Sequence, residues 1–188
     1  MPRTKGRLAR LAHRFLAPAL LIAIVWPLPL QAGGATEQTI VELIHARLSL
    51  MDEVAAYKLL NDVPIEDQER EAVVLAHAVE AAEDVGLDGA TTVAFFSAQI
   101  EAAKAIQVCW MERWRQGESP VPEGAPDLAG VIRPQLIEIG DALIATIARH
   151  AGETGGIDAG TLPAIDCLPP DKADTITSSL SAVAPATP

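Results

Sequence analysis

The sequence has few aromatic residues and lacks several common catalytic motifs. Aromatics make up 4% of the 188 residues, whereas alanine is abundant and 49% of the residues are hydrophobic. This composition favours a helical protein over a β-sandwich or a β-barrel. The chain has no phosphate-binding glycine loop, and the patterns HExxH and GxSxG are both absent. It therefore gives no support for a P-loop nucleotide site, a zinc protease or a serine hydrolase.

Acidic residues are absent from the first 32 residues, which hold five of the 14 lysines and arginines. The basic residues 1–14 are followed by the apolar residues 15–30, which three prolines interrupt, and then by Leu30-Gln31-Ala32. This is the order of a secretory signal peptide, and the apolar run is short for a membrane span. We expect residues 1–32 to be cleaved and the protein to be periplasmic or secreted; the alternative is an uncleaved N-terminal anchor.

Positive charge is scarce in the remaining chain. Without residues 1–32, nine lysines and arginines stand against 25 acidic residues, a formal net charge of −16. Nucleic acid is therefore a poor partner, and so is an anionic membrane once the signal peptide is removed. Because cations are so few, their placement is informative. They are Arg47, Lys58, Arg70, Lys104, Arg113, Arg115, Arg133, Arg149 and Lys172.

Cysteine is also scarce, with only Cys109 and Cys167 present. In an exported protein these two residues could form one disulfide. No clustered histidine or aspartate accompanies them, and the four histidines lack partners at the spacing of a metal site or a catalytic triad. We therefore expect no metal site.

Hydrophobic periodicity predicts an all-α fold, a single helical domain with three main helices and a kinked fourth. The helices are expected at residues 39–60, from Pro64 to about 85, at 90–115 and at 127–150. Pro134 requires either a kink within the fourth helix or a helix start there, with 127–133 as a separate turn.

These helices place the domain at residues 33–150. Residues 151–188 are rich in glycine and proline and then in serine, threonine and alanine. We expect them to form a C-terminal segment and a mobile tail with room for one short helix.

Two cations interrupt the apolar stripe of the first predicted helix. Arg47 and Lys58 are eleven residues apart, which is about three helical turns, so both share a face with Met51 and Val54. A surface helix normally carries its charges on the side opposite its apolar stripe. This placement indicates either side chains that extend to solvent or a pocket for an anion.

Further polar residues are predicted to face inward from other helices. Arg47, Lys58, Arg70, Gln107 and Arg133 together supply three guanidinium groups, one ammonium and one amide. Arginine matches carboxylates in two-point contacts, so this set suits a small dianion. Asp67 and Glu71 lie near Arg70 in the sequence, and their carboxylates could accept a hydrogen bond from a ligand hydroxyl or orient the arginines. No nucleophile or acid–base pair is evident, which indicates catalysis by charge stabilisation alone.

At this point the residues resemble a known family. The matching segments are RL at 47–48, VAAYK at 54–58, PIED at 64–67 with Arg70 and Glu71, and FF at 95–96 followed by QIEAAKAIQ at 99–107. They resemble the all-helical chorismate mutases, in particular the exported (gamma) subclass, closely over residues 40–107 and more loosely to about residue 149.

The resemblance implies an isomerase that rearranges chorismate to prephenate without a cofactor. Arg47, Arg70 and Arg133 would bind the two carboxylates, and Asp67 or Glu71 would accept from the ring hydroxyl. Lys58 and Gln107 are the implied catalytic residues, because they would donate to the ether oxygen on which negative charge develops. The resemblance also implies a pocket made within one chain and a homodimer.

Two positions depart from the family pattern. Ala103 stands where relatives usually have a serine, threonine or asparagine that touches a substrate carboxylate, and Val74 is apolar where some relatives are polar. Two alternatives stay open: an isochorismate pyruvate lyase, which has a similar helical fold and a similar dianion, and a non-catalytic exported binding protein that has kept the pocket. A protein that only binds would not need both Lys58 and Gln107.

Overall fold

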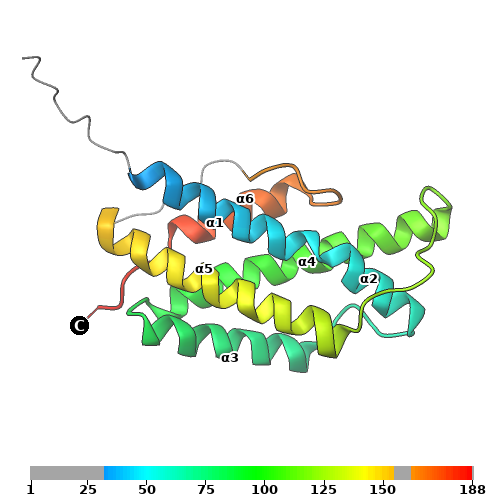
Figure 1. Ribbon diagram of the computed structural model, residues 1–188, viewed down its shortest axis with the longest axis horizontal. Coiled ribbons are helices and arrows are strands. Elements are labelled where there is room, and N and C mark those ends of the chain that lie inside the picture. Colours follow the sequence, from blue (N-terminus) through cyan, green and yellow to red (C-terminus); the bar gives the residue numbers. More distant parts are fainter. Residues whose placement is uncertain (1–31, 155–161, 188) are drawn as a thin grey trace, which may run out of the picture. The chain divides into compact units, whose positions relative to one another are not determined.

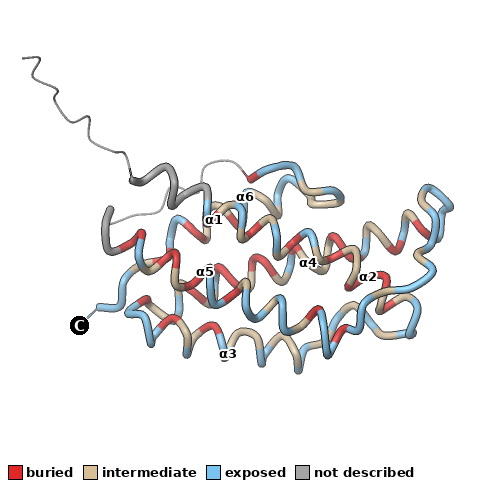
Figure 2. Tube along the Cα trace, in the orientation of Figure 1, coloured by how far each residue is buried: buried red, intermediate tan, exposed pale blue. Residues whose placement is uncertain are grey.

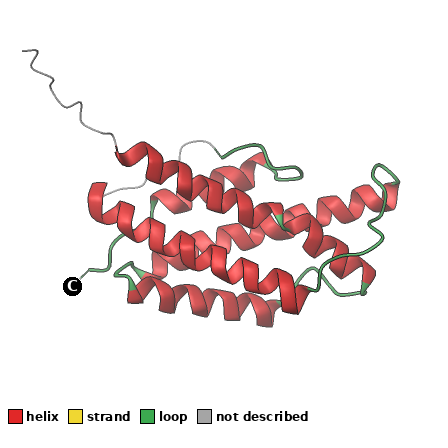
Figure 3. Cartoon of the chain, viewed as in Figure 1, coloured by secondary structure: helices red, strands yellow, loops and turns green. Residues whose placement is uncertain are grey.

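The computed structural model describes residues 32–154 and 162–187, which belong to one compact unit. The expected signal peptide lies outside the described residues, apart from Ala32. The elements in chain order are α1 (Ala32–Ser49), α2 (Met51–Leu60), α3 (Gln68–Asp84), α4 (Gly89–Gln116), the π-helical turn η1 (Leu128–Ile132), α5 (Arg133–Thr154) and α6 (Pro170–Ser181) (Figures 1 and 3). The prediction of an all-α fold is confirmed, since the described ranges contain only one isolated β-bridge, between Leu87 and Pro185.

The first predicted helix is two helices, which corrects the expectation of a continuous helix over 39–60. The break is confined to Leu50, whose φ of −77° and ψ of −5° remain right-handed, and the Val54 amide donates to the Leu50 carbonyl at 3.1 Å. Because this break is mild, α1 and α2 follow one another closely. Arg47 at the end of α1 and Lys58 near the end of α2 therefore still reach a common space.

The second predicted helix begins later than expected, at Gln68 and not at Pro64. Asp67 precedes it with φ of −142° and ψ of 78°, and its Oδ1 atom accepts a hydrogen bond from the Arg70 amide at 3.0 Å. An aspartate that caps the first amides of a helix defines a start more sharply than a proline does. This cap fixes the first turn of α3, which carries Arg70 and Glu71.

The long third predicted helix agrees with α4 to within one residue at each end. Asp88 caps it by accepting from the Thr91 amide at 2.8 Å, and hydrogen bonds from Thr91 lower the pKa of the Asp88 carboxyl. Gly117 ends the helix with φ of 75°, a left-handed conformation that glycine adopts readily. These two signals place the 28-residue helix through the whole bundle (Figure 1).

Of the two alternatives for the fourth predicted helix, the structure has the separate first turn, η1, followed by α5. Asp127 caps η1 through a hydrogen bond from the Gly130 amide, and α5 then begins at Arg133. Pro134 is thus the second residue of α5, where a missing amide hydrogen breaks no helical hydrogen bond. This geometry puts Arg133 at the start of α5.

The C-terminal segment, expected to be a mobile tail with room for one short helix, has that helix as α6 (Pro170–Ser181), and α6 joins the core. Ile176 and Leu180 are fully buried and α6 packs against α4. Beyond α6, the Asp88 amide donates to the Ala184 carbonyl at 2.9 Å. Our expectation weighed the Ser, Thr and Ala content of this segment above the spacing of its two large apolar residues.

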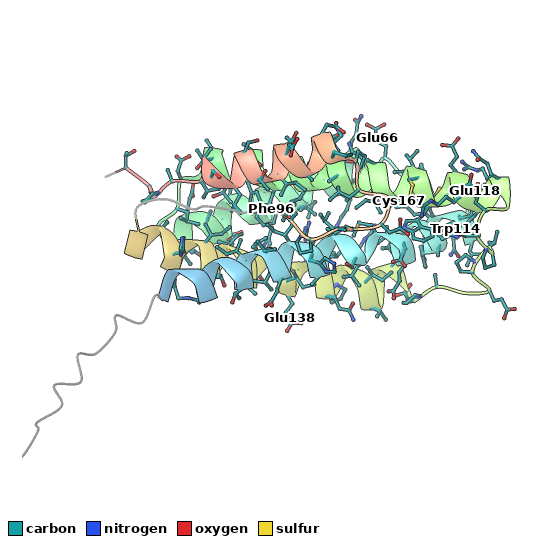
Figure 4. All side chains as sticks on the ribbon, turned by 90° about the horizontal axis from the view of Figure 1, so that it is seen from above. Glu66, Phe96, Trp114, Glu118, Glu138 and Cys167 are labelled. Atoms are coloured by element: carbon teal, nitrogen blue, oxygen red, sulfur yellow. A yellow bond between two sulfur atoms is a disulfide. The ribbon has the colours of Figure 1, made fainter. Side chains whose placement is uncertain are left out.

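A disulfide also holds the C-terminal segment. Cys109 of α4 is bonded to Cys167, which precedes α6, and their Cα atoms are 5.8 Å apart. Figure 4 shows Cys167 against the ribbon of α4. Residues that flank α6 on both sides are thus attached to α4 or to the turn before it.

The hydrophobic core extends along α1, α4 and α5, whose buried positions turn toward the middle of the bundle (Figure 2). A smaller cluster of Ala55, Ala56, Met111 and Trp114 joins α2 to the end of α4. Among the described residues, none of the helices combines the length and the apolar character needed to cross a membrane.

Candidate active site

A cavity of about 290 Å³ lies among α1–α5 and η1. Each of these elements contributes to its lining, so residues far apart in the sequence meet there. All eight site residues predicted from the sequence line it. They are Arg47, Lys58, Asp67, Arg70, Glu71, Ala103, Gln107 and Arg133.

Apolar side chains make up much of the remaining wall, including Met51, Val54, Ile65, Val74, Ile100 and Ile144. Two further lining residues are well exposed, Val73 on α3 at 50% and Ile137 on α5 at 41%. The cavity therefore opens to solvent between α3 and α5. A charged group inside is surrounded largely by hydrocarbon, which strengthens its electrostatic interactions.

The charged lining residues favour an anion. The cavity wall includes five lysines and arginines but only three carboxylates, those of Asp67, Glu71 and Asp141. With histidine neutral, the wall carries two positive charges in excess, although the whole chain is strongly acidic. A ligand with two negative charges would balance this wall.

Arg47 is a cation held by a backbone carbonyl and an aromatic ring. Its Nη1 atom donates to the Leu136 carbonyl at 2.9 Å, and its guanidinium lies 5.5 Å from the centre of the Phe96 ring. Burial lowers the pKa of Arg47 to about 10, so it still carries its charge at neutral pH. No carboxylate in the described part of the chain forms an ion pair with it. Its charge is thus available to a ligand.

Lys58 is almost fully buried, with 8% of its surface exposed. Its Nζ atom donates to the Ile65 carbonyl at 2.6 Å, which uses one of its three hydrogens. Burial lowers the pKa of Lys58, the nearby Asp67 opposes this shift, and Arg133 adds to it. Lys58 is therefore a desolvated ammonium with further hydrogens to donate.

Gln107 is buried on the cavity side of α4. Its Nε2 atom donates to the Ala103 carbonyl at 3.1 Å and lies 3.7 Å from the Met51 sulfur. A thioether is a weak acceptor, so the second hydrogen of this amide can transfer to a better acceptor at little cost. Within the described residues its Oε1 atom has no hydrogen-bond partner.

The two predicted carboxylates differ in how far they are already engaged. Asp67 uses Oδ1 to cap α3, and its Oδ2 lies 3.5 Å from Arg133 Nη2. Among the described residues, the Glu71 carboxylate has a hydrogen bond only through Oε2, to Lys104 Nζ at 3.2 Å. Glu71 therefore has the freer oxygen for a ligand, while Asp67 caps the helix that carries Arg70 and faces Arg133.

Sequence reasoning missed two charged features of the wall. Lys104 lines the cavity and contacts Glu71 and Glu101, and the Glu101 hydrogen bond raises the pKa of Lys104. His77 and Asp141 form a 2.8 Å contact that joins α3 to α5. Lys104 stands next to Ala103 in the family motif, which could have drawn attention to it. For His77 the sequence carried no signal.

The sequence and the fold are similar to those of known proteins. The family described as chorismate mutase type II matches residues 35–108. The solved secreted chorismate mutase from Yersinia pestis superposes with a TM-score of 0.71 at 30% identity, over 79% of this chain and 97% of that one. The chain belongs to the chorismate mutase family. The resemblance seen in the sequence is thereby confirmed.

Curated chorismate mutases are similar over part of their length. The secreted chorismate mutase of Yersinia pestis is 38% identical over 108 residues, which is 57% of each protein. The secreted chorismate mutase of Mycobacterium tuberculosis is 30% identical over 136 residues, or 70% of this chain and 67% of that protein. The first of these alignments thus spans little more than half of the relative. The family match ends at residue 108, and only the folded bundle brings Arg133 to the same cavity.

Proposed function

We propose that this protein is a chorismate mutase that converts chorismate to prephenate. The observation that carries the proposal is an apolar cavity with two positive charges in excess, in a chain of this family. Chorismate is a dicarboxylate of matching charge. In the rearrangement the carbon–oxygen ether bond breaks as a new carbon–carbon bond forms within the same molecule, so no group is transferred to the protein.

Arg47, Arg70 and Arg133 are proposed to bind the two carboxylates. Arg47 supports this role because its charge is otherwise unpaired, and its guanidinium is held by the Leu136 carbonyl and the Phe96 ring. The side chain of Phe96 lies in the interior of the bundle (Figure 4). Fixed cations hold the substrate in its compact reactive conformer, which removes rotational freedom before the barrier is reached.

Lys58 and Gln107 are proposed to stabilise the transition state. Negative charge grows on the ether oxygen as its bond to carbon lengthens, and both residues have hydrogens to donate in a desolvated setting. Hydrogen bonds that strengthen as charge develops lower the barrier more than they tighten substrate binding. Glu71 is proposed to accept from the ring hydroxyl, in preference to the already engaged Asp67.

Ala103 is proposed to make no polar side-chain contact with the substrate. A hydroxyl at this position would reach a carboxylate in relatives, and a hydrogen bond to a charged group contributes roughly 1.5–3 kcal/mol. The backbone carbonyl of Ala103 retains a different use, because it accepts from Gln107. We therefore expect weaker substrate binding than a hydroxyl would allow, with the ether-oxygen donors intact.

Export and dimerisation are also part of the proposal. The basic and apolar residues 1–32 and the relatives named as secreted support a periplasmic or secreted protein. The homodimer rests on the family resemblance. Sedimentation of residues 33–188 and fractionation of cells that express the full chain would test these two points.

Product analysis on residues 33–188 tests the activity. We expect chorismate to disappear and prephenate to form in equal amounts without added metal or cofactor. Pyruvate release from isochorismate would instead indicate a lyase. Tight binding of a transition-state mimic without turnover of either compound would indicate a binding protein, with Ala103 as the first position to restore.

A further inference from the structure

Lys104, which was not among the predicted site residues, joins α4 to α3 at the cavity wall. Lys104 lies on α4, one residue after Ala103, and its side chain is 22% exposed. Its Nζ atom contacts Glu101 Oε1 at 2.7 Å on the same helix and Glu71 Oε2 at 3.2 Å on α3. The ammonium is therefore held from its own helix and presented to the carboxylate of a neighbouring one.

Glu71 needs such a partner because little else fixes it. Within the described chain Lys104 is the one hydrogen-bond partner of the Glu71 carboxylate, and Glu71 lies in the first turn of α3 and lines the cavity. A glutamate side chain has three rotatable bonds, so an unanchored carboxylate would sample many positions. Lys104 takes Oε2 and leaves Oε1 free.

We propose that Lys104 is a positioning residue, which orients Glu71 so that its free oxygen accepts from the hydroxyl of the bound substrate. This inference rests on the proposed function, because it concerns recognition of the ring hydroxyl. Lys104 acts through Glu71 and touches no substrate atom. Glu101 in turn steadies Lys104 from the solvent side, where Glu101 is 54% exposed.

The role predicts a specific kinetic signature. A contact to the hydroxyl is present both before and during the rearrangement, so its loss weakens binding of both states alike and raises KM while kcat changes little. We expect Lys104→Met to raise KM about tenfold, the scale of one charge-assisted hydrogen bond. Glu101→Gln should raise KM less, about twofold, since Lys104 keeps its contact with Glu71.

A double-mutant cycle with Glu71→Gln separates an indirect role from a direct one. If Lys104 acts through Glu71, adding Lys104→Met to Glu71→Gln raises KM no further. A further tenfold rise in the double variant would overturn the inference and make Lys104 a direct ligand of a substrate carboxylate. An unchanged KM in the single variant Lys104→Met would overturn it as well.

Two controls keep the result interpretable. Lys172→Met removes one positive charge from α6, outside the cavity, and should leave KM unchanged. Lys104→Arg retains a cation that reaches Glu71 and should restore most of the lost affinity, which a purely structural defect would not permit. Absence of turnover in the wild-type protein would contradict the proposed function itself, whereas normal wild-type turnover with an unaffected Lys104→Met contradicts this inference alone.

Discussion

The region matched by the family, residues 35–108, and the region that follows it contribute to the cavity in different ways. The first supplies seven of the eight predicted site residues from α1–α4 and the turn before α3. The second supplies Arg133, and it completes the bundle through α5, the disulfide and α6. Most of the predicted site residues thus come from one continuous segment, whereas the structure that holds them depends on long-range contacts.

This comparison separates two kinds of defect. Substitutions of cavity residues in the first region should reduce turnover and leave the fold intact. Substitutions in the second region that lie away from the cavity lining should lower stability and leave turnover intact. The following predictions test that division in order of decreasing effect.

Lys58→Ala should give the largest loss of activity. Removal of a donor aimed at developing charge typically lowers kcat by about 10²–10³-fold, and Lys58 is the buried ammonium of the cavity. Steady-state turnover of chorismate measures this, with circular dichroism to check the fold. Lys172→Ala, which removes a lysine far from the wall, serves as the matched control. Near-normal turnover of Lys58→Ala would remove Lys58 from the mechanism.

Replacement of both cysteines should lower stability and leave activity nearly unchanged. Cys109→Ser combined with Cys167→Ser removes a cross-link that spans 58 residues and should lower the free energy of unfolding by about 2–4 kcal/mol. Neither cysteine lines the cavity, so kcat at a temperature where the protein is folded should stay within about twofold. Urea denaturation and kinetics on one preparation measure both quantities. A large loss of kcat without loss of stability would break the proposed division between the two regions.

Arg133→Ala should lower kcat/KM by about tenfold, less than Arg47→Ala. Arg133 is a third exposed and already faces Asp67 at 3.5 Å, whereas Arg47 is desolvated and has no carboxylate partner among the described residues. Solvent and Asp67 screen the charge of Arg133, which weakens its electrostatic attraction for an anionic ligand. Parallel kinetics of the two variants give the order, and an equal or larger loss for Arg133→Ala would reverse our ranking of the cations.

The pH dependence should show the smallest effect near neutrality. Burial lowers the pKa of Lys58, so the fraction of charged Lys58 should fall at a lower pH than for an exposed lysine. We expect kcat/KM to decline as the pH rises, with the midpoint of this alkaline decline below 10.5, the ordinary pKa of lysine. This midpoint reports the free protein. A bound dianion favours the charged form, so the limb in kcat should lie at higher pH.

The contribution of Lys58 to stability should change with pH in the direction opposite to that of activity. Its pKa in the folded protein is below its value in the unfolded chain, so between these values the unfolded chain binds more protons. Stability from this group therefore rises with pH while activity falls. Denaturation of wild type and Lys58→Met across this range separates the two trends, and coincident losses of activity and stability would contradict them.

Much of the site was predictable because its residues share one compact motif. Arg47 and Lys58 stand out as cations within an apolar stripe, and spacing alone places both on one face. Arg133 was harder to place, because it lies beyond residues 40–107, where the resemblance is close, and only the bundle brings it to the cavity. Lys104 was missed because a lysine with glutamate three residues before it has the usual pattern of a solvated helix surface.

The fold was predictable where capping and periodicity agreed. Asp88 and Gly117 mark both ends of α4. Pro134 predicted either a kink or a separate first turn, and the structure has the turn η1. The break at Leu50 carries no capping signal, since its backbone stays close to helical. α6 was underestimated because only two large apolar residues, Ile176 and Leu180, distinguish it from a polar tail.

The burial of Ile176 and Leu180 also sets when the domain can fold during synthesis. Both side chains pack into the core beside α4, although they are encoded near the end of the chain. A ribosome that has released α1–α5 has therefore produced only part of the hydrophobic core. The complete core can therefore form only after α6 has been synthesised.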